Sequence, residues 1–182
     1  MRFLIILFIS FFIQTKPNTV FKEPLNFDAE ININSEGNLI SRGIMSFREG
    51  AFIYNLVSPY NQTIASENGK LFVQDNDFQQ VIIYNATKAF FLQDLFSNKY
   101  ETENFPCQNN CFKVNPKDGS TFQEALVSMN ENVIDWIRLV DIKDQRIFIK
   151  FENFKFESSN ITYVVPQNYE IISNDWYSAV KR

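Results

Sequence analysis

The 182-residue chain contains no histidine, only two cysteines and five glycines, and no cluster of lysine or arginine. Histidine is the commonest general base and the commonest transition-metal ligand, so its absence argues against most catalytic and metal centres. A net charge of −4 without a basic run argues against nucleic acid, which is bound by clustered cations. We therefore expect no enzyme activity, no catalytic or metal-binding residues, no cofactor and no nucleic-acid partner.

Phenylalanine is the residue in excess, with 20 copies. So many large rings are typical either of a thick hydrophobic core or of a cavity lined with aromatic side chains, which accepts irregular apolar guests. The composition alone leaves both interpretations open.

Residues 1–16 have the pattern of a secretory signal peptide. Arg2 supplies the positive charge, and the apolar run from Phe3 to Ile13 is too short to span a bilayer as a helix. The segment lacks a clear small-residue cleavage site, so an uncleaved anchor is the alternative. We expect an exported protein in which residues 17–182 form one domain.

The two cysteines lie close together in the stretch PCQNNCF. Export leads to an oxidising compartment, where such a pair usually closes as a disulfide. The residues between Cys107 and Cys111 are favourable in turns, so we expect the disulfide at the tip of a hairpin. A metal site or a redox motif fits this spacing less well.

Alternating apolar and polar residues predict β-strands along most of the chain. In PLNFDAEININ, for example, the apolar residues from Leu25 to Ile33 occupy every second position. Turn signals such as Asn68-Gly69 separate the strands. We expect strands at about residues 25–33, 38–49, 51–58, 61–66, 70–75, 79–85, 111–116, 121–129, 133–142, 146–156 and 161–172.

Two local departures from strict alternation carry further information. The stretch from Lys88 to Ser97 has apolar residues at helical spacing and predicts one helix, which either plugs a core or covers a barrel. In RIFIKFENFKF the apolar parity switches, which predicts a β-bulge at Asn153. The whole pattern indicates a mainly β fold of about ten to eleven antiparallel strands, curled around an apolar interior with a helix on one side.

Several stretches resemble, in the same order, those of the LolA-type outer-membrane lipoprotein carrier family. FDAEI resembles the family's Phe-x-Ala-x-Phe, SFREGAFIY its Arg-Pro-x-x-Phe-x-Trp, and IASENGKLF its Ser-Asp-Gly-Lys turn. FKVNPK and ITYVVP resemble the later Phe-x-Leu-x-Pro-Lys and Phe-x-Phe-x-x-Pro. The resemblance runs from about Leu25 to Ile172 and depends on the order of the motifs.

The resemblance implies an unclosed antiparallel β-barrel with a helical lid around an apolar cavity. It implies a monomeric periplasmic chaperone for acylated lipoproteins, which receives them from an ATP-driven release complex of the inner membrane and passes them to an outer-membrane acceptor. The acyl-chain cavity is then expected to be lined by Phe27, Ala29, Ile31, Phe52, Tyr54, Phe91 and Leu95.

Arg48 matches the family's arginine, which implies that it acts as a lid latch by donating hydrogen bonds to backbone carbonyls. The alternative is a solvated strand residue. Counting along the strand, we expect Phe52 to lie on the same side as Arg48. The chain departs from the family in having Glu49 where the family has proline, and in having only about eight residues between the signal-like run and Leu25.

Two further functions stay open at this point. One is a related periplasmic lipid or glycolipid carrier, or a lipoprotein sensor of the same fold. The other is a secreted enzyme that uses carboxylates, for which Asp135, Asp141 and Asp144 are the candidates. Inward-facing paired carboxylates would favour the enzyme, and a purely apolar cavity would exclude it.

Overall fold

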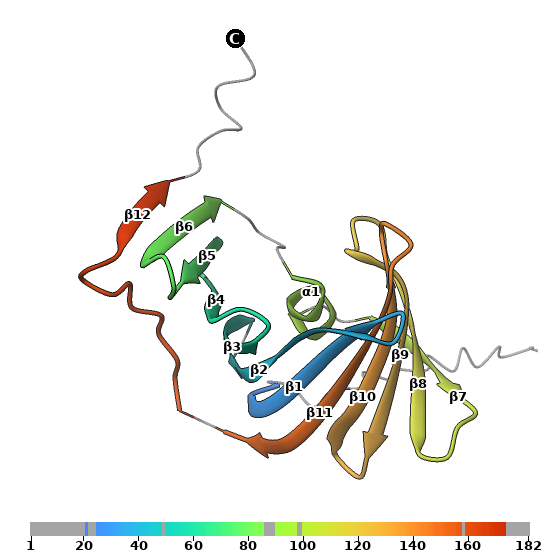
Figure 1. Ribbon diagram of the computed structural model, residues 1–182. Helices are drawn as coiled ribbons and strands as arrows, with labels where there is room; N and C mark the ends of the chain where they lie inside the picture. The colour runs from blue at the N-terminus through green and yellow to red at the C-terminus, as the bar shows by residue number, and fades with distance from the viewer. Residues whose placement is uncertain are drawn as a thin grey trace, which may run out of the picture.

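The computed structural model describes residue 21 and residues 25–48, 50–85, 90–97, 100–157 and 159–173. The expected signal peptide, residues 1–16, and the domain boundary after it lie outside the described residues. The described chain forms one sheet of twelve strands and one short helix, as Figure 1 shows.

The elements follow the alternation pattern closely. Ten of the expected strands lie within two residues of their predicted bounds, while β7 was not predicted. In chain order the elements are β1 (Phe27–Ser35), β2 (Asn38–Arg48), β3 (Ala51–Ser58), β4 (Gln62–Glu67), β5 (Lys70–Asp75), β6 (Gln80–Asn85), α1 (Phe91–Ser97), β7 (Glu101–Phe105), β8 (Asn110–Asn115), β9 (Phe122–Asn130), β10 (Val133–Asp141), β11 (Arg146–Phe156) and β12 (Glu170–Ser173).

The sheet has β1 near its middle, hydrogen-bonded to β2 on one side and to β11 on the other. From there one meander runs through β2 to β6 and the other runs back from β11 to β7, so that β12 and β7 form the two outer edges. All pairs are antiparallel except β12 with β6. The sheet curls so that α1 lies on its concave side, and its edges do not join (Figure 1). The predicted class, a mainly β unclosed barrel with a helix, is confirmed.

The predicted bulge on β11 is present at Asn153. Asp28 pairs with Lys155 while Glu30 pairs with Glu152, so β11 carries one residue more than β1 between these pairs. Asn153 has a φ of 52°, a left-handed conformation that asparagine tolerates better than most residues. The extra residue returns Phe154 to the concave side, where its ring stacks on Phe27 at a centroid distance of 4.7 Å.

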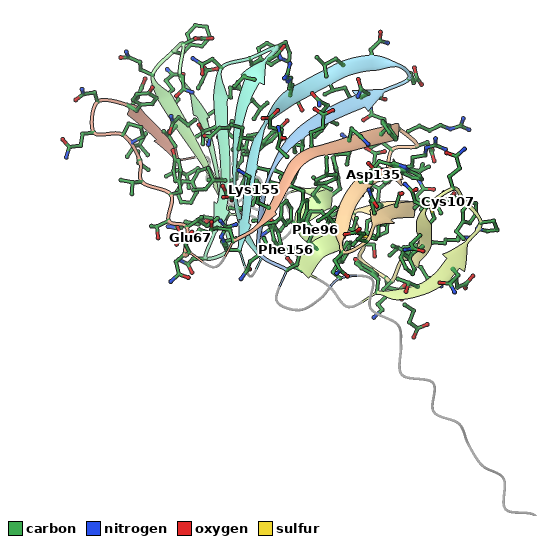
Figure 2. All side chains as sticks on the ribbon, turned by 90° about the horizontal axis from the view of Figure 1, so that it is seen from below. Glu67, Phe96, Cys107, Asp135, Lys155 and Phe156 are labelled. Atoms are coloured by element: carbon green, nitrogen blue, oxygen red, sulfur yellow. A yellow bond between two sulfur atoms is a disulfide. The ribbon has the colours of Figure 1, made fainter. Side chains whose placement is uncertain are left out.

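Strand β7 has no periodicity that could have predicted it. Its sequence is ETENF, and all but one of its residues are exposed. It pairs along its length with β8 across a turn closed by the Cys107–Cys111 disulfide, at the hairpin labelled in Figure 2. Charged residues on such an edge strand also discourage pairing with other chains.

The stretch that follows β11 does not form the long strand expected at residues 161–172. Residues 159–169, here called the strap, cross the convex side of β4–β6 and lead into β12 (Figure 1). The ring of Tyr163 packs on Phe72 at 4.9 Å, and its hydroxyl donates to Gln74 Oε1 at 2.8 Å. Phe72 and Gln74 alternate with Leu71, which faces the core, so Tyr163 of the strap packs on the other face of the sheet.

Candidate functional site

The residues expected to line a cavity lie together on the concave side. The strand residues and Leu95 of α1 have at most 2% of their surface exposed and belong to one continuous apolar cluster. Phe91 is partly buried and packs against this cluster. The expected set is therefore spatially coherent: Phe27, Ala29, Ile31, Phe52, Tyr54, Phe91 and Leu95. Its role in binding acyl chains stays a prediction.

Helix α1 rests on aromatic rings. The ring of Phe96 meets those of Phe27 and Phe47 edge-on, at centroid distances of 5.5 and 5.3 Å. Phe90, just before the helix, lies 5.3 Å from Phe52. Edge-to-face contacts of this kind contribute only about 0.5–1.5 kcal/mol each beyond burial. The helix is thus held by many small contacts, several of them with phenylalanine rings of β1, β2 and β3.

Two adjacent polar residues of α1, Gln93 and Asp94, also attach the helix to the sheet through hydrogen bonds, and we call them its anchors. Gln93 Nε2 donates to the carbonyl oxygen of Gly50 at 2.8 Å and to Ser66 Oγ at 2.9 Å. Asp94, 1% exposed, accepts hydrogen bonds from the Thr121 backbone N–H at 2.7 Å and from the Tyr100 hydroxyl at 3.0 Å. Burial raises the pKa of Tyr100, and the Asp94 carboxylate acts in the same direction. The anchors connect the helix to both halves of the sheet.

The Asp94 anchor is expected to contribute measurably to stability. In Asp94→Asn, one of the two accepting oxygens becomes an NH2 donor, so either the Thr121 N–H or the Tyr100 hydroxyl loses its acceptor. We therefore expect the free energy of unfolding to fall by about 1–3 kcal/mol. Urea denaturation followed by tryptophan fluorescence measures the change. Asp77→Asn, at an exposed position of the β5–β6 turn, is the matched control. Equal losses in the two variants would contradict the role given to Asp94.

Arg48 lies on the face of β2 opposite to Phe52, and the expectation that they share a face is wrong. In the β2–β3 hairpin Phe47 pairs with Phe52 and Arg48 pairs with Ala51. Neighbouring residues of a strand point to opposite faces, so Phe52 joins Phe47 on the concave side while Arg48 points outward. The turn at Gly50 separates β2 from β3, so the alternation of faces does not continue from Arg48 to Phe52.

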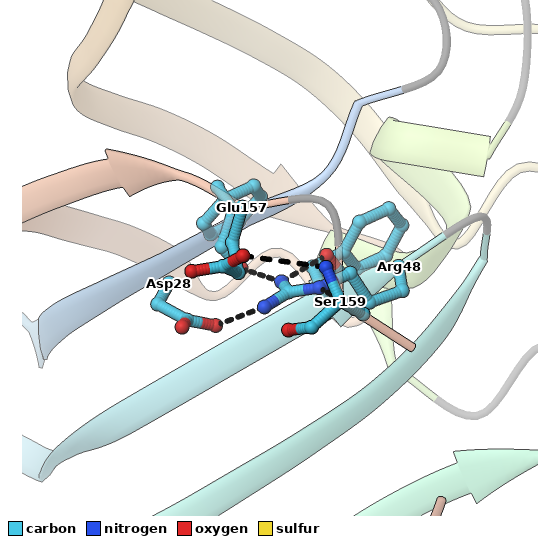
Figure 3. Close-up of polar contacts among 6 residues, drawn as sticks. Asp28, Arg48, Glu157 and Ser159 are labelled. Carbon is cyan, nitrogen blue, oxygen red and sulfur yellow. Dashed lines mark hydrogen bonds and ion pairs between the residues drawn. The ribbon is translucent and has the colours of Figure 1, made fainter. Parts of the chain in front are cut away.

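Although it points outward, Arg48 is buried and is not a solvated surface charge, with 6% of its surface exposed. Figure 3 shows its guanidinium enclosed by polar partners. Nη1 donates to the carbonyl oxygens of Phe27 at 2.5 Å and Phe47 at 2.8 Å, and Nε donates to that of Ser159 at 2.7 Å. Nη2 pairs with Asp28 Oδ1 at 2.8 Å.

These contacts join β1, β2 and the beginning of the strap. Arg48 does bind several backbone carbonyls, as a latch would, but none of its hydrogen bonds among the described residues is with α1. From α1, Gln93 donates a hydrogen bond to the carbonyl oxygen of Gly50 in this hairpin. The lid-latch role of Arg48 stays a prediction.

Sequence reasoning missed Gln93 and Asp94, although a signal was present. In FLQDLF the two polar residues interrupt a segment that is otherwise apolar all round. A helix apolar on most of its surface is buried, and polar side chains buried with it require hydrogen-bond partners. Asp94 and Gln93 were therefore identifiable as anchors, but their partners were not.

The carboxylates considered for an enzyme do not converge. Asp135 pairs with Lys150, Asp141 accepts from the backbone N–H groups of Lys143 and Gln145, and Asp144 accepts from Gln123. In the part of the chain that the structure describes, no cluster of three potential ligands is arranged to hold a metal ion. The described helix is also too short to cross a membrane.

Comparison with known proteins connects this geometry to a family. No family model matches the sequence. The chain is 25% identical over 140 residues to an outer-membrane lipoprotein carrier protein of Chromohalobacter salexigens, covering 69% of this chain and 67% of the relative. It is 25% identical over 162 residues to the protein of the same name from Francisella tularensis subsp. tularensis, covering 81% of this chain and 79% of the relative.

A solved structure shares the fold. An uncharacterized conserved protein from Thermus thermophilus superposes with a TM-score of 0.52 at 11% identity, over 82% of this chain and 90% of that one. A LolA superfamily protein from Nitrosomonas europaea gives a TM-score of 0.41 at 11% identity, over 78% of this chain and 90% of that one. The sequence matches and the open, helix-bearing sheet fit a diverged LolA-type member of the outer-membrane lipoprotein carrier proteins.

Proposed function

We propose that the chain is a periplasmic carrier, without enzyme activity, that binds the acyl chains of lipoproteins between its concave face and α1. It receives cargo released from the inner membrane by an ATP-driven complex and delivers it to an outer-membrane acceptor. The names of the relatives support the cargo class. The observation that carries the proposal is that one seven-residue helix covers an aromatic face in a sheet whose edges do not meet.

The physical argument concerns exchange of the helix for cargo. Each buried methylene group contributes roughly 0.8 kcal/mol, so an acyl chain needs a continuous apolar cover to cross water. The expected cavity residues on the strands beneath α1 are already buried, with at most 2% of their surface exposed. Cargo therefore enters as the helix moves away, and the ring contacts of Phe96 are replaced by acyl contacts.

A reversible cross-link tests whether the helix has to move. A Cβ atom built at Gly50 would lie 3.9 Å from the Cβ of Ser97 in α1, close to the typical disulfide value of about 3.8 Å. The double variant Gly50→Cys/Ser97→Cys is expected to lose affinity for a synthetic triacyl-cysteine peptide at least about tenfold when oxidised. Dithiothreitol should restore binding, as measured by native mass spectrometry.

The controls separate the lock from its side effects. Wild type with and without dithiothreitol accounts for the Cys107–Cys111 disulfide. The single variant Gly50→Cys accounts for strain, because Gly50 has a φ of +88°, where other residues cost roughly 1–2 kcal/mol. Undiminished binding by the oxidised double variant would overturn the proposal. Free lipid instead of lipopeptide on protein purified from periplasm would favour the lipid-carrier alternative.

A further inference from the structure

A polar cleft of about 630 Å³ opens beside α1, at the end of the sheet where Arg48 lies. Four elements surround it: the β2–β3 hairpin, the β4–β5 hairpin, α1 and the start of the strap. Its described lining includes Arg48, Ser66, Glu67, Gln93, Ser97 and Thr162. Amide and hydroxyl groups predominate, in contrast to the apolar cluster on the concave side.

The cleft adjoins the proposed acyl site directly. Ser66 is the register partner of Phe52, which belongs to the apolar cluster. Gln93 bonds to Ser66 from the helix, one residue before the buried Asp94. Among the described residues the buried Gln93 Oε1 has no hydrogen-bond partner, so the proposed movement of α1 would expose an unpaired acceptor where the cleft meets the apolar interior. An acylated molecule whose chains lie under α1 would have its polar head where the cleft meets the apolar interior.

The charges of the cleft determine which head it accepts. Arg48 is the only cation in the described lining, and Asp28 and three carbonyl oxygens already engage it. The carboxylate of Glu67 adds a negative charge, while Lys70, its register partner, is not part of the lining. Among the described residues a phosphate group would thus meet no available cation, and Glu67 would repel it.

We infer that the polar cleft holds the phosphate-free head of the cargo, the glyceryl-cysteine and its first peptide amides, and that it discriminates against phospholipids. The inference rests on the proposed function and names the feature that makes the site selective. Peptide N–H groups can donate to Gln93 Oε1, and the hydroxyl and amide groups of the cleft suit ester and amide groups. Glu67 is the residue that determines the selectivity.

Two ligands with identical palmitoyl chains test the inference: an N-acetylated dipalmitoylglyceryl-cysteine peptide and dipalmitoyl phosphatidylglycerol. Each competes with a fluorescent fatty acid for the protein. We expect wild type to prefer the peptide at least about tenfold. Glu67→Lys should reduce that preference several-fold by strengthening phosphatidylglycerol binding. Glu124→Lys, which makes the same charge change at an exposed position of β9, should leave the preference unchanged.

The outcomes distinguish this inference from the proposed function. If both ligands displace the probe equally and Glu67→Lys leaves their ratio unchanged, acyl binding stands and the selective cleft is overturned. If neither ligand nor the fatty acid binds, the proposed function fails and the inference fails with it. An equal shift in Glu67→Lys and Glu124→Lys would assign the effect to net charge and would also overturn the cleft.

Discussion

Replacing Arg48 with alanine is expected to lower the free energy of unfolding by about 2–4 kcal/mol. The variant would leave the carbonyl oxygens of Phe27, Phe47 and Ser159 without their shared donor. The loss is smaller than for a fully buried ion pair, because the Asp28 side chain is 39% exposed and can be hydrated. Chemical denaturation measures the change, and Arg42→Ala, at an exposed arginine of the same strand, is the control.

The location of the effect separates two roles for Arg48. Hydrogen exchange of Arg48→Ala should show lost protection in the strap and in β12, with α1 still protected. Arg48→Lys should resemble alanine more than wild type, because an ammonium group cannot reproduce the forked donors of a guanidinium. Lost protection confined to α1 would contradict the strap anchor and would support the lid latch that the family resemblance implies.

Gly43→Ala is expected to destabilise the protein by about 3 kcal/mol or more. A Cβ atom at this position would lie 2.1 Å from the backbone oxygen of Asn55 and 2.8 Å from Tyr54 Cε2. The pairing of β2 with β3 shifts at Gly43, where β3 carries one extra residue and its backbone approaches closely. A backbone oxygen cannot rotate away as a side chain can, so the two strands would have to separate.

The same substitution disturbs a buried tyrosine. Tyr54 lies in the core cluster and donates to Ser41 Oγ at 3.0 Å, and burial raises the pKa of its hydroxyl. We expect the Tm of Gly43→Ala to fall by about 6–12 °C, from the usual scaling for a chain of this length. Ser46→Ala in the same strand is the control for composition. An unchanged Tm would mean that β3 can withdraw from β2 without cost.

Ten of the strands were predicted well because each has one face in the core. In such a strand the pleat buries every second residue, so apolar and polar residues alternate and the strand can be recognised from its own sequence. The bulge at Asn153 was predicted for the same reason, since the extra residue leaves a visible change of parity. Strand β7 was missed because it is an edge strand with an exposed, charged sequence.

The site was predictable only in part, because its polar contacts join distant segments. The apolar residues of the expected cavity came together as the alternation and the resemblance implied. The partners of Arg48 depend on where residue 159 passes after β11, which is 111 positions away. Whether Arg48 and Phe52 share a face of the sheet depends on the turn at Gly50, because the length of that turn determines which residues of β2 and β3 are paired.

The central position of β1 has a consequence for the order in which the chain assembles. Ile31 pairs with Gly43 on one side and with Phe151 on the other. As the exported chain emerges into the compartment where it folds, β1 to β6 can therefore form their hairpins, but one edge of β1 stays open until residues 146–156 emerge. An open edge beside an aromatic face is a site for aggregation. We therefore expect the chain to be most prone to aggregation after β1 to β6 have emerged, and the pairing of β11 with β1 ends that interval.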